Sequence, residues 1–417
     1  MRSVTCQVDS NQLLVPATPT TYTLELTSRC NSACAGCGNV FDRALGEMAF
    51  DRWRSILIQL RPHIVNLRLT GGEPTLYRHF PELVRFIDSL GVPFVVFSNG
   101  LWSQRDETLA LLLACNNLDG LLISLHGHTP KAHQAFSGVD SFDRVAATIK
   151  LATEAGLTIN TNTVLSRYNH RAIPAIVALS GELGARFAAF SRYYGPPTPV
   201  TDLTEDEFRT AAATVQRLRD QGLPAQFNNS VPSCFDGRRA KSCPAGITHC
   251  TIDPLGRVRP CTHAPHVLGD LLAEPITEIW HNEAADQWRS LIPDTCSLCA
   301  EFVRCRGGCK AMAYHLRQSH DPLIRKPLQE PLRCESSGRM QLYSGARPEP
   351  NFTLRVESFG YLLINRNQII PVRSETRPLL EALDGVTTLS QIEQDFGSAG
   401  LAFVAHLFNK GLVVLNQ

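Results

Sequence analysis

Three cysteines near the start of the chain have the residue type and spacing of metal ligands. Cys30, Cys34 and Cys37 follow directly after an alternating segment at residues 22–26, which we expect to be a strand. Three thiolates within eight residues can ligate three irons of a [4Fe–4S] cube, whereas fully ligated cubes use four cysteines. The remaining iron would be open to a substrate or cosubstrate. A zinc site that lacks one ligand is the alternative.

A second group of cysteines begins at residue 243. Its spacing is Cys-x12-Gly-x4-Cys, then Cys-x2-Cys-x5-Cys-x3-Cys, then one further cysteine. This spacing indicates metal clusters, with a pair of zinc knuckles as the alternative. The seven residues are Cys243, Cys261, Cys296, Cys299, Cys305, Cys309 and Cys334.

The composition of the whole chain supports metal ligation for these thiols. The 417 residues contain 14 cysteines, but the N-terminal segment MRSVTCQVDSNQ has no signal-peptide core. No apolar run approaches the ~18 residues that span a bilayer. We therefore expect a cytoplasmic protein, in which disulfides are rare. With 40 basic and 39 acidic side chains, the chain also lacks the basic excess of nucleic-acid and membrane-surface binders, so we expect neither partner.

Strands and helices alternate from residue 22 to about residue 221, in six successive β-α units. This order predicts an α/β fold built on a partial (β/α)6 barrel. The carboxyl ends of barrel strands form the face that carries active sites. The polar and glycine residues at the ends of the second to sixth strands should therefore share one face with the three cysteines. They are Gly71, Gly72, Glu73, Pro74, Ser98, Asn99, Ser124, His126, Asn162 and Arg192.

The remaining chain divides into regions of different texture. From 231 to about 345 cysteine, glycine, proline and arginine dominate, so clusters rather than an apolar core should hold this part together. Residues 345–350 have the composition of a linker. We expect an N-terminal extension (1–20), the barrel (21–228), a cysteine-rich iron–sulfur domain (229–345) and a small α+β domain (346–417).

The last domain is predicted to be winged-helix-like, with a hairpin, three short helices and a closing strand. Winged helices often bind DNA, but residues 351–417 carry five basic and six acidic side chains. A DNA reader should present a basic face, so the charge count argues against that role.

The motif Cys30-x3-Cys34-x2-Cys37 after a first strand resembles the signature of radical SAM enzymes. In that family the open iron is chelated by S-adenosylmethionine, whose reductive cleavage yields a 5′-deoxyadenosyl radical. The segment 71–74 resembles the family's GGEP motif, which holds the methionine amino group, and the later strand ends resemble segments that contact the cosubstrate. One departure is Gly36, because many members carry an aromatic residue there, close to the adenine.

The second cysteine group resembles, gap for gap, the seven-cysteine SPASM extension of some radical SAM enzymes. The resemblance implies two auxiliary [4Fe–4S] clusters, and therefore three clusters in all. The fourth ligand of the first auxiliary cluster is Cys234 or Cys250, or that iron is open to substrate; Cys234 is our preference. By the family pattern Cys243, Cys261 and Cys309 hold the first, and Cys296, Cys299, Cys305 and Cys334 hold the second.

The C-terminal domain resembles the leader-peptide recognition (RRE-like) domain of ribosomal-peptide maturases, with a structural cap as the alternative. Together the resemblances imply a radical SAM maturase that crosslinks or rearranges a ribosomally made precursor peptide and takes electrons from a flavodoxin- or ferredoxin-type reductant. His263 is the candidate general base, against a structural histidine. The alternatives are a radical SAM dehydrogenase acting on a protein side chain or small molecule, and a non-enzymatic iron–sulfur carrier or scaffold.

Overall fold

The computed structural model describes residues 13–39, 46–228, 231–237, 243–332, 343–366 and 368–416. The chain forms two compact units, which are described separately below. One unit spans Thr18–Leu332, and the other contains Arg333–Gln417 together with Met1–Ala17. The predicted ligand Cys334 lies outside the described residues.

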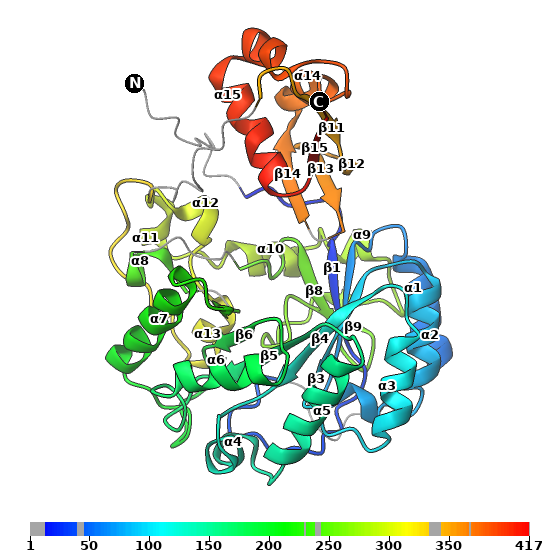
Figure 1. The fold of residues 1–417 in the computed structure, drawn as a ribbon, viewed down its shortest axis with the longest axis vertical. Coiled ribbons are helices and arrows are strands. Elements are labelled where there is room, and N and C mark those ends of the chain that lie inside the picture. The colour runs from blue at the N-terminus through cyan, green and yellow to red at the C-terminus, as the bar shows by residue number, and fades with distance from the viewer. Residues whose placement is uncertain are drawn as a thin grey trace. The chain divides into compact units, whose positions relative to one another are not determined.

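The larger unit is built on seven parallel strands that are neighbours in chain order (Figure 1). The six predicted β-α units are confirmed, and a seventh strand, β7, follows them. The strands are β1 (Thr21–Glu25), β2 (Asn66–Thr70), β3 (Phe94–Ser98), β4 (Leu118–Ser124), β5 (Ile159–Val164), β6 (Ala188–Ser191) and β7 (Ala225–Phe227).

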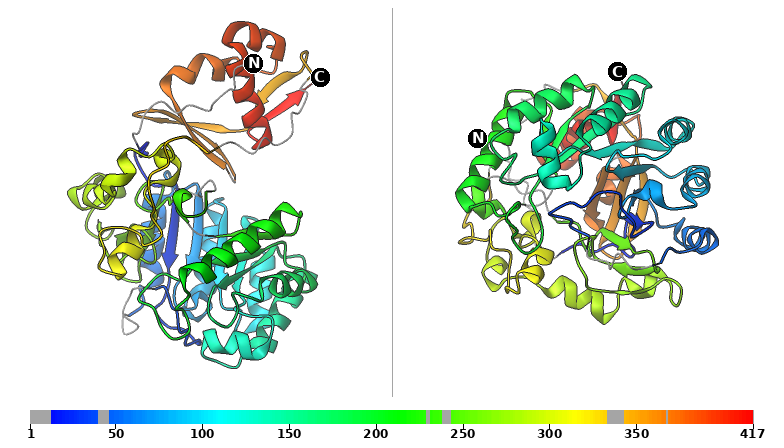
Figure 2. Two further views of the ribbon diagram at one scale, coloured as in Figure 1. Left: turned by 90° about the vertical axis from the view of Figure 1, so that its left-hand side faces the viewer. Right: turned by 90° about the horizontal axis from the view of Figure 1, so that it is seen from below.

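Helices cover the outer face of this curved sheet, as the end-on view shows (Figure 2, right). In β2 the outward side chains of Leu67 and Leu69 are 1% and 0% exposed, whereas the alternate residues stay partly exposed. This period-two burial is the pattern of a strand with one packed face. The helices are α1 (Phe50–Leu60), α2 (Phe80–Ser89), α3 (Arg105–Leu113), α4 (Pro130–Ser137), α5 (Phe142–Glu154), α6 (Ile173–Glu182) and α7 (Glu205–Asp220).

The cysteine-rich region continues the barrel sheet instead of forming a separate layer. Strand β8 (His249–Ile252) pairs in parallel with β1, and β9 (Arg257–Arg259) and β10 (Gly269–Asp270) extend the edge in antiparallel order. Trp280 and Trp288 are buried here, so the region has more apolar packing than we predicted. Its helices are α8 (Ser233–Asp236), α9 (Ile276–Ile279), α10 (Glu283–Ser290), α11 (Asp294–Ser297), α12 (Phe302–Cys305) and α13 (Lys310–His315).

The C-terminal unit has two small antiparallel sheets packed on helices. Residues 347–350, predicted as part of a linker, form strand β11 and pair with β15, and the strand β14 was not predicted. The elements are β11 (Arg347–Pro350), β12 (Thr353–Glu357), β13 (Gly360–Asn365), β14 (Gln368–Arg373), a 3-10 turn (Ser374–Thr376), α14 (Arg377–Glu381), α15 (Leu389–Asn409) and β15 (Val413–Asn416).

The three short helices predicted in this unit correspond to α14 and the two halves of α15. A non-helical residue, Gly397, with φ 69°, divides α15 into these two halves. Leu363 from the sheet packs with Ile392, Val404 and Leu407 from α15 in one apolar core. In the described parts of the chain, every helix is too short or too polar to cross a bilayer.

Candidate functional site

The loop that carries Cys30, Cys34 and Cys37 lies against the end of β2. The amide of Gly72 donates to the carbonyl of Thr27 at 2.7 Å, and the amide of Glu73 donates to that of Arg29 at 2.8 Å. A Cβ atom on Gly72 would overlap the Arg29 carbonyl, and one on Gly71 would lie 2.6 Å from the Thr27 oxygen. The two glycines are therefore required for this close backbone approach.

The end of α4 supports the same loop from another side. The amides of Ala33 and Ala35 donate to the carbonyls of Ser137 and Phe136, each at 2.9 Å. Gly36 has no room for a side chain here, because a Cβ atom would lie 3.0 Å from the rings of both Phe136 and Tyr193. Two aromatic rings from elsewhere in the chain thus occupy the space beside the residue where the family carries its own aromatic side chain.

Asn99 connects the end of β3 to the cysteine loop. Its side-chain nitrogen is 3.7 Å from the sulfur of Cys30, 2.7 Å from the Asn31 side-chain oxygen and 3.1 Å from the Ser32 hydroxyl. The structure therefore brings this predicted site residue to the first cysteine.

Glu73 is fully buried, and its carboxylate is engaged by protein donors. It accepts hydrogen bonds from the hydroxyls of Ser98 and Thr75 at 2.9 and 2.8 Å, and from the amide of Asn99 at 2.7 Å. Burial raises the pKa of Glu73, and these hydrogen bonds oppose that rise. The Ser98 hydroxyl in turn accepts from the indole of Trp102 at 2.8 Å. Glu73 and Ser98 thus hold the ends of β2 and β3 together, and the contact of either side chain with a cosubstrate stays a prediction.

The interior of the barrel is lined by polar side chains. Ser124 and Asn162 are opposite each other in the β4–β5 register, and Leu122 is opposite Asn160, so all four share one face. All four are partly exposed, in contrast to the buried residues between them. Asn162 also accepts a hydrogen bond from Ser191 on β6 at 2.8 Å. Ser124 and Asn162 therefore share one partly exposed face of the sheet, and their contact with a cosubstrate stays a prediction.

His126 fastens the end of β4 to its neighbours. Burial and the nearby His133 lower the pKa of His126 to about 3, so its ring is neutral. The ring packs on Phe136 at 4.2 Å between centroids and accepts from the amide of Val164 at 3.3 Å. The Asn169 side chain donates to the His126 carbonyl at 2.8 Å. The position is structural, and a contact of His126 with the cosubstrate stays a prediction.

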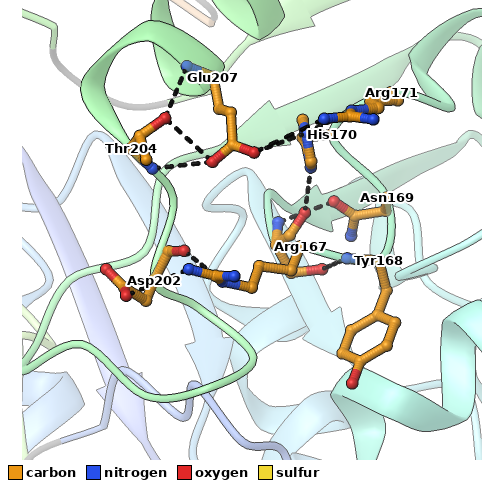
Figure 3. Close-up of polar contacts among 9 residues, drawn as sticks. Arg167, Tyr168, Asn169, His170, Arg171, Asp202, Thr204 and Glu207 are labelled. Carbon is orange, nitrogen blue, oxygen red and sulfur yellow. Dashed lines mark hydrogen bonds and ion pairs between the residues drawn. The ribbon is translucent and has the colours of Figure 1, made fainter.

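The loop after β5 is fixed by charged contacts at the carboxyl end of the barrel (Figure 3). Arg167 donates to the Asp202 carbonyl at 2.7 Å, and the His170 ring lies 3.6 Å from the Glu207 carboxylate. Glu207 also completes the capping box of α7 with Thr204. This loop is therefore anchored to the helix that follows β6, beside the mouth of the barrel.

The first auxiliary set brings together Cys243, Cys261 and Cys309. Burial raises the pKa of Cys309 to about 12. Burial also raises the pKa of Cys261, and the neighbouring thiols of Cys243 and Cys309 add to this rise. Arg192 forms a buried, two-pronged ion pair with Asp321 at 2.7 and 3.2 Å, and Asp321 also accepts from the amide of Cys309 at 2.8 Å. Arg192 thus contacts the auxiliary region through Asp321, and its contact with the cosubstrate stays a prediction.

The second auxiliary set contains Cys296, Cys299 and Cys305, and the structure adds Cys234 to it. All four line one pocket. The preference for Cys234 as a partner of the first auxiliary set therefore does not agree with its position. Cys250, the other candidate, is fully buried within β8.

His263 lies between the cysteine loop and the auxiliary region. Its ring is 2.8 Å from the Gly38 carbonyl and 4.8 Å from the ring of Tyr194. Burial lowers the pKa of His263 to about 4, and the Gly38 contact partly offsets this. The imidazole is neutral, as a base must be, but one ring nitrogen is engaged by backbone. Its role as a general base stays a prediction.

The thiols have surroundings suited to iron–sulfur clusters. Backbone amides donate to several of the sulfurs: Ser32 to Cys30 and Met312 to Cys309, both 3.4 Å, Arg325 to Cys234 at 3.2 Å, and Leu328 to Cys299 at 3.4 Å. Such hydrogen bonds set the potentials of thiolate-held clusters. Within the described ranges no three His, Cys, Asp or Glu side chains converge as ligands of a single metal ion.

Asp321, Phe136 and Tyr193 are parts of this site that the sequence did not reveal. None belongs to a spaced motif, and each reaches the site through tertiary contacts. The sequence offered one signal for Asp321: it is a carboxylate in a region rich in arginine.

Two family profiles match this chain over the parts just described. The profile of the radical SAM superfamily matches residues 24–179, and the SPASM profile, an iron–sulfur cluster-binding domain, matches residues 243–306. The chain is a radical SAM enzyme with a SPASM domain. The matches agree with [4Fe–4S] clusters and S-adenosylmethionine as its cofactors.

Relatives of this radical SAM enzyme match most of its length. It is 27% identical over 343 residues to the PqqA peptide cyclase of Rhizobium meliloti, covering 76% of this chain and 90% of that one. It is 28% identical over 316 residues to the mycofactocin maturase MftC of Mycobacterium tuberculosis, covering 71% and 79%. The crystal structure of Streptococcus suis SuiB bound to its precursor peptide SuiA shares the fold, with a TM-score of 0.64 and 16% identity over 74% and 76% of the chains.

Proposed function

We propose that this radical SAM enzyme matures a ribosomally made precursor peptide by forming a crosslink or rearranging its backbone or side chains. The observation that carries the proposal is the similarity to a peptide cyclase and a peptide maturase, which extends through both the barrel and the cysteine-rich region. A scaffold or electron carrier would have no need of the polar barrel interior beside Cys30, Cys34 and Cys37.

When bound at the cluster of Cys30, Cys34 and Cys37, S-adenosylmethionine supplies a 5′-deoxyadenosyl radical that abstracts a substrate hydrogen. The chain's own residues contribute position and protection. Gly71 and Gly72 fix the cysteine loop on the sheet, and the partly exposed interior around Ser124 and Asn162 offers hydrogen bonds to cosubstrate and peptide.

Two auxiliary clusters accompany this first one, for a total of three. Support comes from the two separate groups of cysteines, one around Cys261 and one around Cys296. Both lie in the same compact unit as the barrel, so they can pass electrons to or from the substrate. The external reductant is a flavodoxin- or ferredoxin-type protein.

The C-terminal unit binds the leader segment of the precursor by adding it as a strand to the edge of β12. Leu354 and Val356 on this edge are 52% and 75% exposed. The β12–β13 register pairs Leu354 with Leu363, which is buried in the core of the unit. Among the described strands β12 is an edge of this sheet. The exposed pair therefore continues the apolar face to a position where an added strand would bury it.

The opposite edge of the three-stranded sheet is less suited to strand addition. Strand β14 contains Pro371, which has no amide to donate, whereas the described β12 contains no proline. The leader is therefore expected to carry alternating apolar residues that pack beside Leu354 and Val356.

The test of the reaction is anaerobic incubation with reductant, S-adenosylmethionine and a candidate precursor peptide. A mass change in the peptide, together with 5′-deoxyadenosine, is expected, and Cys30→Ala should abolish both. Formation of 5′-deoxyadenosine with an unchanged peptide would reject the peptide as substrate. Absence of 5′-deoxyadenosine from the iron-loaded enzyme would contradict radical catalysis.

The docking site is tested with Val356→Lys in the full-length enzyme. We expect affinity for the peptide to fall at least tenfold, because a charge would replace an apolar contact on the edge. Val386→Lys is the matched control, since Val386 is 72% exposed in the same unit but lies outside the sheet. Equal affinities of the two variants would exclude β12 as the docking edge.

A further inference from the structure

The pocket between α8, α11 and α12 contains a thiol, that of Cys234, which the family pattern does not assign to it. Its walls hold the sulfurs of Cys234, Cys296, Cys299 and Cys305. The remainder of the lining is mostly apolar, and Phe302 and Ile324 form a small core with Cys296. Four thiols around one apolar pocket are the complete ligand set of a [4Fe–4S] cube.

The segment after α13 covers two of these sulfurs with backbone amides. Arg325 donates its amide to the Cys234 sulfur at 3.2 Å, and Leu328 donates to the Cys299 sulfur at 3.4 Å. One segment thus donates amide hydrogen bonds to two thiols, Cys234 and Cys299, that are far apart in the sequence. Hydrogen bonds of this kind stabilise thiolates bound to iron.

Electrostatics within the pocket agree with this grouping. Burial raises the pKa of Cys234, and the neighbouring thiols of Cys305 and Cys299 raise it further. Burial likewise raises the pKa of Cys296 to about 11, with Cys305 and Cys234 as the next causes. Iron would remove this cost, because a coordinating thiol is deprotonated by the metal.

The other two described cysteines outside the family pattern, Cys250 and Cys115, lie elsewhere. Cys250 is opposite Tyr22 in the β8–β1 register and is fully buried in the sheet. Cys115 donates to the Leu111 carbonyl at 3.3 Å, at the end of α3. Among the described residues, only Cys234 joins an auxiliary set without being part of the seven-cysteine pattern.

We propose that Cys234 is a thiolate ligand of the second auxiliary cluster and completes it with Cys296, Cys299 and Cys305. Cys334 is then not required for this cluster. The inference rests on the second auxiliary cluster proposed above. It also leaves the first auxiliary set with three thiolates, Cys243, Cys261 and Cys309, among the residues that the structure describes.

The test compares Cys234→Ala, Cys334→Ala and Cys250→Ala after anaerobic reconstitution, by iron content and electron paramagnetic resonance. Wild type should bind about twelve irons. Cys234→Ala should lose about four, or convert one cluster to a three-iron form, whereas the other two variants should match wild type. Loss in Cys334→Ala, or full iron with an unchanged spectrum in Cys234→Ala, would overturn the proposal. A wild type with about eight irons that loses none in Cys296→Ala would instead reject the second auxiliary cluster itself.

A measurement on the unmutated enzyme guards against misfolded variants. Iodoacetamide labelling is mapped by mass spectrometry before and after removal of iron. Cys234 should be protected at least tenfold by iron, together with Cys296 and Cys299, while Cys334 and Cys115 should react at similar rates in both forms. Protection of Cys334 without protection of Cys234 would reverse the assignment.

Discussion

The loop of Cys30, Cys34 and Cys37 and the region of the auxiliary cysteines are held in place by different means. Backbone hydrogen bonds fix the loop to the end of β2 on one side and to α4 on the other. In the auxiliary region Cys296 and Cys305 lie in helices of only four residues, α11 and α12. Isolated helices of this length are unstable. We therefore expect the barrel to shape the first site before iron binds, whereas the second auxiliary pocket should depend more on the cluster proposed for it.

Removal of all iron should show this difference most strongly. We expect hydrogen exchange in residues 293–328 to accelerate by at least about 100-fold, equivalent to about 2.7 kcal/mol. Exchange in β2, β3 and β4 should change by less than about threefold. The triple variant with alanine at Cys30, Cys34 and Cys37 is the control, since it should leave 293–328 protected. Equal acceleration in both regions of iron-free enzyme would contradict the comparison.

The ion pair of Arg192 and Asp321 joins the two regions, so Asp321→Asn tests whether the barrel supports the auxiliary side. Both side chains are at most 6% exposed, and the change leaves the guanidinium buried without its counter-charge. Breaking such a pair costs about 3–5 kcal/mol. Urea denaturation followed by tryptophan fluorescence measures the effect.

A matched control removes an exposed ion pair from the same unit. Glu154→Gln breaks a contact with Lys150 whose partners are both 63% exposed. The expected loss is below about 0.5 kcal/mol. If the two variants lose similar stability, the buried pair does not anchor the auxiliary region.

The same contrast explains what the sequence could predict. The alternation of strands and helices is local, so it predicted the β-α units, and spaced cysteines predicted the two metal regions. Which thiols meet depends on tertiary contacts, so neither the position of Cys234 nor the role of Asp321 followed from spacing. Proline-rich residues 347–350 have the composition of a linker, yet pairing with β15 makes them a strand.

Gly72→Ala should disturb the first site without touching the auxiliary one. The added methyl group would overlap the Arg29 carbonyl, which is backbone and cannot rotate away. We expect a loss of about 1–3 kcal/mol and reduced iron at the first cluster only. The matched control is Gly181→Ala in α6, where the space around a Cβ atom is open and stability should rise by about 0.5–1 kcal/mol. Normal iron content in Gly72→Ala would show that the loop is not held by this contact.

The smallest expected effect is the dependence on pH that His126, on the barrel side, contributes to stability. His126 has a folded-state pKa of about 3 against an ordinary value of 6.5. As the pH falls below 6.5, His126 takes up a proton in the unfolded chain but not in the folded one. The free energy of unfolding therefore decreases as the pH falls from 6.5 toward 3. The loss approaches about 1.4 kcal/mol per pH unit for this one group.

This slope is measured by urea denaturation at pH 7.5, 6.0 and 5.0 in His126→Gln and in His128→Gln. His128 is exposed and lies two residues away, so it serves as the matched control. Acid also weakens clusters in both variants, and only the difference between their slopes reports on His126. The shallower slope should appear in His126→Gln, because glutamine binds no proton in either the folded or the unfolded chain. Identical slopes would mean that the folded protein does not hold the ring of His126 neutral. The contacts of this ring with His133 and Phe136 on α4 would then not exclude a proton from it.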